Sequence, residues 1–99
     1  MTTDRELLEM AAKAARYQYA KHGGYIVVDG IPGNWNPLTD DGDALRLAVK
    51  LEIELWFGNG GLNASGMSMD IEEDYGEDPA AATRRAIVRA AAAIGEAMK

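Results

Sequence analysis

The chain of 99 residues contains no cysteine and a single histidine, His22. Disulfides, thiol catalysis and thiolate zinc sites are therefore excluded, and so is a metal site built from several histidines. The longest apolar runs, 25–28 and 90–95, are far too short to cross a bilayer. Residues 1–10 lack the basic and apolar regions of a signal peptide. We expect a protein of the cytoplasm, or of a host's cytoplasm, with no membrane contact.

Positive charge is also scarce. Ten lysines and arginines stand against 16 aspartates and glutamates, which gives a net charge of −6. Nucleic-acid binding depends on cations that neutralise phosphates, so nucleic acid is not an expected partner. Hydrophobic residues make up 47% and charged residues 26% of the chain. These values are typical of a globular protein, and the length predicts one domain over residues 1–99.

Three segments have the apolar spacing of helices. They are residues 3–21, residues 39–51 and residues 79–99, the last beginning at the strong start signal Asp78-Pro79. The second segment leaves so narrow a polar stripe that we expect it to be largely buried.

Three other segments are typical of strands. Residues 25–28 are apolar on both faces, which predicts a covered, central strand, while residues 53–57 and 67–72 alternate between apolar and polar. The expected loops are 29–38, 58–66 and 73–78. The glycine-rich loop 58–66 is expected to be a mobile connection of the hairpin.

The order α-β-α-β-β-α predicts a mixed α/β (α+β) fold with helices layered on a small three-stranded sheet. The first two strands should be parallel, joined by a right-handed crossover, and the hairpin should add an antiparallel strand. The alternation of the last two strands predicts a sheet face in water, unless a helix covers it.

No motif indicates catalysis, a cofactor or a metal. Asp40, Asp41 and Asp43 are bunched at a helix start, where capping is favoured over metal binding. Loop 58–66 joins two strands and lacks lysine, unlike a phosphate-binding loop. His22 has no nucleophile or orienting partner in any motif, so a helix-terminal role is favoured over a general base.

Six residues are candidate contacts for a partner. Arg85 and Arg89, with Arg84, form a basic patch that would touch phosphate or an acidic protein, although a solvated helix face is the favoured interpretation. An acidic stretch would mimic DNA phosphates, against the favoured interpretation of a solubilising edge. Its candidate contacts are Asp70, Glu72 and Glu73. Trp35 is expected to anchor its loop on the core, and becomes a contact if its ring is exposed.

Two strings resemble the phage ABA-sandwich family of small tailed-phage and prophage proteins. The first, residues 35–51, reads WNPLTDDGDALRLAVKL, and the second, residues 81–91, reads AATRRAIVRAA. The resemblance implies an α/β/α layered fold in which a helix covers the open sheet face. The family has no established activity, so the resemblance implies no functional residues.

The sequence thus favours a noncatalytic phage or prophage accessory protein that acts through protein–protein contact with a host or phage protein, and forms a homodimer. The alanine faces of the first and third helices either form the dimer contact or pack together within one chain. One alternative is a regulator of nucleic-acid metabolism, by direct binding or acidic mimicry. Another is a small-ligand enzyme, which a pocket joining Trp35, Asp40 and Asp41 would favour.

Overall fold

The computed structural model describes residues 2–20, 25–28, 31–67 and 69–98. The predicted fold class is confirmed, because helices pack on a three-stranded sheet in a mixed α+β arrangement. The elements follow in the order α1 (Asp4–Ala15), β1 (Gln18–Ala20), β2 (Tyr25–Val28), β3 (Ile31–Gly33), α2 (Asp41–Lys50), β4 (Glu54–Phe57), β5 (Gly61–Gly66), β6 (Met69–Asp74) and α3 (Pro79–Ala97).

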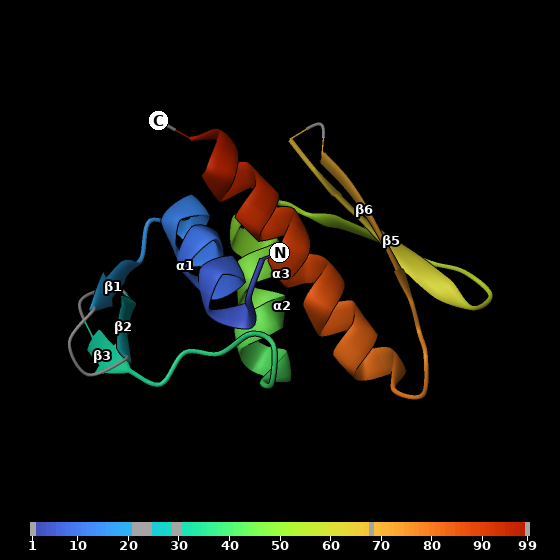
Figure 1. Ribbon diagram of the computed structural model, residues 1–99, viewed down its shortest axis with the longest axis horizontal. Helices are drawn as coiled ribbons and strands as arrows, with labels where there is room; N and C mark the ends of the chain where they lie inside the picture. The colour runs from blue at the N-terminus through green and yellow to red at the C-terminus, as the bar shows by residue number, and fades with distance from the viewer. Residues whose placement is uncertain (1, 21–24, 29–30, 68, 99) are drawn as a thin grey trace.

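The helices lie on one side of the main sheet. This sheet has the strand order β4-β5-β6, and α3 packs against it while α1 and α2 pack against α3 (Figure 1). The other sheet face is open: Asp70 and Glu72 are exposed on it, as the sequence alternation predicted. Among the described helices none covers this outer face, so the covering helix that the resemblance implied is not found there.

A second small sheet, β1-β2-β3, stands beside α1 (Figure 1). The predicted parallel crossover is wrong, because β2 pairs antiparallel with β1 and β3 and takes no part in the main sheet. Every strand pair of the two described sheets is antiparallel. Short hairpins close small loops, which costs less chain entropy than a crossover. β3 also lies inside the segment 29–38, which was expected to be a loop.

The first helix is shorter than predicted. Thr3 and Glu6 form a capping box at its start, and Arg16 takes a left-handed conformation, with φ 63°, that ends it. Residues 18–20 then form β1 instead of a further helical turn, because they gain ladder hydrogen bonds with β2. The expected stop signal at residues 21–23 lies outside the described residues.

The expectation that residues 58–66 form one loop is wrong. The chain turns at residues 58–60, and residues 61–66 form β5, the central strand of the main sheet. Leu62 and Ala64 of this strand are buried in the core. A Cβ added at Gly61 would lie 2.6 Å from the carbonyl oxygen of Glu73. Glycine at this position therefore permits the close approach of two strands.

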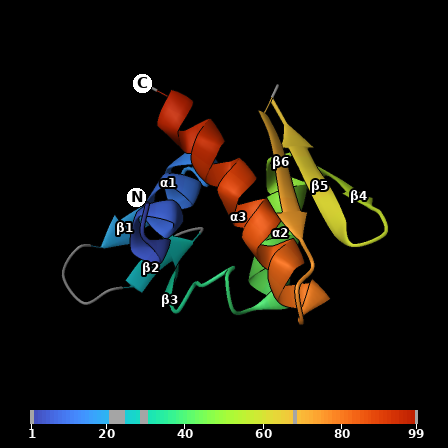
Figure 2. The ribbon, with the colours of Figure 1, turned by 45° about the vertical axis from the view of Figure 1, so that its right-hand side comes forward.

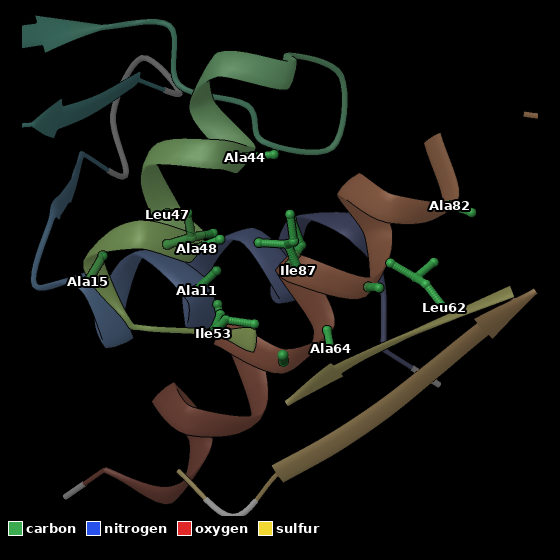
Figure 3. Close-up of a cluster of buried hydrophobic side chains, with 14 residues drawn as sticks. Ala11, Ala15, Ala44, Leu47, Ala48, Ile53, Leu62, Ala64, Ala82 and Ile87 are labelled. Atoms are coloured by element: carbon green, nitrogen blue, oxygen red, sulfur yellow. The ribbon is translucent and has the colours of Figure 1, made fainter. Parts of the chain in front are cut away.

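Small side chains close the core between the helices. Figure 3 shows Ala11 of α1, Leu47 of α2, Ile87 of α3 and Leu62 of β5 around one apolar centre. Most alanines of α1 and α3 are buried as these two helices pack along each other within the chain, whereas Ala80 and Ala97 of α3 are exposed. Gly95 lies so close to the backbone of Met10 that a Cβ has no room. Packing within one chain therefore accounts for the alanine face of α1 and for the buried part of the alanine face of α3.

Candidate functional site

The predicted basic patch on α3 is engaged in ion pairs. Arg84 is largely buried, and its guanidinium lies 2.6 Å from Asp41 and donates from Nε to the Leu38 carbonyl at 2.8 Å. These contacts tie the start of α2 to α3. Arg84 therefore acts as a structural connection between the two helices.

Arg85 and Arg89 also have acidic partners. Arg85 lies 3.3 Å from Asp4, and Arg89 lies 2.6 Å from Glu73 and donates to the Glu72 carbonyl at 3.2 Å. Since each cation is already compensated, the patch offers little free positive charge to a phosphate. This arrangement weighs against direct nucleic-acid binding.

The three acidic candidates divide between the two faces of β6. Glu73 points to the helix side and pairs with Arg89, whereas Asp70 and Glu72 are exposed on the outer face. Asp74 shares that outer face, because side chains two residues apart in a strand point the same way. In the described chain, no cation lies within ion-pair distance of these three outer carboxylates. We call Asp70, Glu72 and Asp74 the acidic row.

Trp56 was not among the predicted contacts, yet it stands out on the same outer face. Its partner across the ladder is Asn63, whose next partner is Glu72. The Trp56 side chain is 67% exposed, beside an open depression of about 370 Å³ lined also by Phe57 and Asp74. In the alternating segment 53–57, Trp56 points to the other face of the strand from Leu55. This alternation was the sequence signal that could have indicated the exposure of Trp56.

A second surface missed by sequence reasoning is apolar. Leu45 and Val49 of α2 are 60% and 69% exposed, although this helix was expected to be largely buried. Phe57 of β4 is 63% exposed. A groove of about 400 Å³ runs between α2, β4 and α3, lined among others by Leu45, Leu55, Phe57 and Ile87. We call Leu45, Val49, Leu55 and Phe57 the α2–β4 surface.

The Trp35 side chain is partly buried by contacts within the chain. Its ring meets Tyr17 edge-on, with centroids 5.5 Å apart, and both rings pack against the core. The Lys50 ammonium lies 4.5 Å from the centre of the Tyr17 ring. The expectation that Trp35 anchors its loop agrees with this packing.

The aspartates at the start of α2 have structural partners. Asp40 caps the helix by accepting from the Asp43 amide at 2.8 Å, and Asp43 accepts from the Asn36 amide at 3.0 Å. Neither Trp35 nor Asp40 lines the two depressions described above, so these do not join Trp35, Asp40 and Asp41. Within residues 2–20, 25–28, 31–67 and 69–98, no group of three or more metal-ligating side chains gathers. His22 lies outside the described residues.

Comparison of the chain with protein-family models, curated proteins and solved structures gives no match. None of the helices in the described part of the chain combines the length and the apolar character needed to span a membrane.

Proposed function

We propose that the protein is a noncatalytic phage or prophage accessory protein that acts in the host cytoplasm through protein–protein contact. The two strings that resemble the phage ABA-sandwich family support the phage origin. The observation that carries the contact is the α2–β4 surface, where large apolar side chains stand in water on neighbouring elements. Grouped exposed apolar residues are typical of interaction sites.

The position of this surface adds to the argument. Leu45 and Val49 are one helical turn apart, so they stand on the same side of α2. Leu45 and Phe57 line one groove, which joins the helix to the strand. A partner that fills this groove would bury apolar area from both elements at once.

Photocrosslinking in the cells that carry the gene tests the proposal. A photoreactive residue at Val49 should form adducts with a protein, whether another chain or a second copy, identified by mass spectrometry. The control is the same residue at Glu96, which is exposed on α3. Adducts that are absent at Val49, or equally frequent at Glu96, would contradict a contact through the α2–β4 surface.

The acidic row favours one second candidate, a regulator that mimics DNA phosphates. Asp70, Glu72 and Asp74 are exposed at every second residue of β6, so their charges repeat about every 6.8 Å. Such a row would compete for the basic groove of a nucleic-acid-binding protein.

Release of host proteins from immobilised double-stranded DNA tests the mimicry. The wild-type protein should displace them, and a triple variant with Asp70→Asn, Glu72→Gln and Asp74→Asn should not. The charge-matched control replaces Glu6, Glu9 and Glu96, which lie on helices, with glutamine. Equal displacement by both variants would count against the row.

A further inference from the structure

β4 is an edge strand with open hydrogen-bonding groups. It pairs with β5 on one side only, and Figure 2 shows it at the rim of the sheet. The Gly58 amide donates to the Gly61 carbonyl at 2.9 Å, and antiparallel pairs alternate in their bonding. Trp56 therefore directs its backbone groups to Asn63. Leu55 and Phe57 direct theirs away from β5, to the open edge.

The residues of this edge lack the usual protection against another strand. β4 reads Glu-Leu-Trp-Phe and contains no lysine or proline, which commonly block edges. The opposite edge strand, β6, carries four acidic residues among its six. A second β6 would be repelled there, so of the two edges of the main sheet the β4 edge is the one suited to pairing.

We infer that the occupant of the α2–β4 surface is a second copy of this chain, joined through antiparallel pairing of the two β4 strands. A two-fold axis perpendicular to the sheet keeps the helices of both copies on one side. In the matching register Trp56 lies opposite Trp56 of the second copy, and Leu55 lies opposite Phe57. The outward backbone groups of Leu55 and Phe57 then bond each other in both directions.

The register avoids a contact between like charges at the seam. Glu54 is the only charged residue of β4, and the register sets it opposite Gly58 of the second copy, not opposite another carboxylate. On the helix side of the seam, Phe57 of one copy packs on Leu55 of the other, at the mouth of its groove. The exposed Leu45 and Val49 of both copies lie on that same side.

The available area sets the strength of the dimer. A buried aromatic side chain covers about 150–250 Å², so Trp56 and Phe57 of two copies contribute roughly 400–650 Å² from their exposed parts. Stable interfaces bury at least about 1,200 Å² in total. Leu45, Val49 and the strand backbone must supply the rest, and we expect dissociation in the micromolar range.

Sedimentation equilibrium of the full chain tests the dimer, which rests on the proposed contact through the α2–β4 surface. The wild-type protein should change from monomer to dimer as its concentration rises through the micromolar range. Phe57→Lys should raise the dissociation constant at least about a hundredfold. Met67→Lys is the matched control, because Met67 is 73% exposed but lies beyond the end of β5. It should leave dimerisation unchanged.

A disulfide tests the register. Since the chain has no cysteine, Trp56→Cys yields a bridge only between two copies. Oxidation should produce a covalent dimer with Trp56→Cys and none with Glu72→Cys on the same face. A wild-type monomer at all concentrations, or equal bridging by both variants, would overturn the inference. If Val49 still crosslinks to another protein in that case, the proposed function stands and only the partner is wrong; no adduct at Val49 would defeat both.

Discussion

Two apolar regions of the molecule contrast in side-chain size and in exposure. Where α1 and α3 pack together, the side chains are mostly alanines and are buried. On the α2–β4 surface, leucine, valine and phenylalanine stand largely in water. Alanine faces let two helices approach closely within one chain, whereas large side chains left exposed indicate a contact still to be made. The alanine faces, for which the sequence left a dimer contact and packing within one chain both open, thus lie mostly inside the chain.

The largest difference in stability should appear between a buried and an exposed leucine of the same helix, when each is replaced by alanine. Leu47 is fully buried and Leu45 is 60% exposed, both on α2. Leu47→Ala should lower the free energy of unfolding by about 3 kcal/mol, because it leaves a cavity. Leu45→Ala should lower it by less than about 1 kcal/mol. Urea denaturation measures both free energies of unfolding. Similar losses in the two variants would contradict the proposal that Leu47 is buried and Leu45 is exposed.

A smaller effect should follow from a single methyl group between α1 and α3. In Gly95→Ala the new Cβ meets the Met10 backbone, which no side-chain movement relieves. We expect a loss of about 2–3 kcal/mol in thermal or urea unfolding. Gly33→Ala is the control, because open space surrounds that Cβ, and it should change stability by no more than about 1 kcal/mol. A stabilising Gly95→Ala would show that the helices are not closely packed.

The smallest of the three effects concerns the link that positions α2. Arg84→Gln removes the ion pair with Asp41 and the bond to the Leu38 carbonyl, and should cost about 1–2 kcal/mol. It should also weaken dimerisation, because α2 carries half of the α2–β4 surface. Arg85→Gln removes a more exposed pair and should cost less than about 0.5 kcal/mol. Equal losses would mean that Arg84 does not fix α2 to α3.

Local signals predicted the elements that local chemistry decides. Asp78 caps α3 and Pro79 opens it, as the sequence indicated. β5 was missed because the glycines of residues 58–66 were interpreted as flexibility. The dipeptide Asn59-Gly60, a strong hairpin-turn signal, would have revealed the strand that follows.

The partners of the candidate residues depend on contacts distant in sequence, which no local pattern specifies. Arg84 meets Asp41, and Arg89 meets Glu73, only because α3 packs against both α2 and the sheet. The predicted basic patch is consequently a set of ion pairs. The exposure of Trp56 is different in kind, because strand alternation alone was enough to indicate it, although Trp56 was not named as a contact.

Amide hydrogen exchange of β4 at low and high protein concentration tests the central claim most directly. If two β4 strands pair, the amides of Leu55 and Phe57 should exchange fast in dilute protein and become protected in concentrated protein. The Trp56 amide, which belongs to the β4–β5 ladder, should be protected equally at both concentrations. Leu55 and Phe57 amides with the same rates at both concentrations would contradict pairing at this edge.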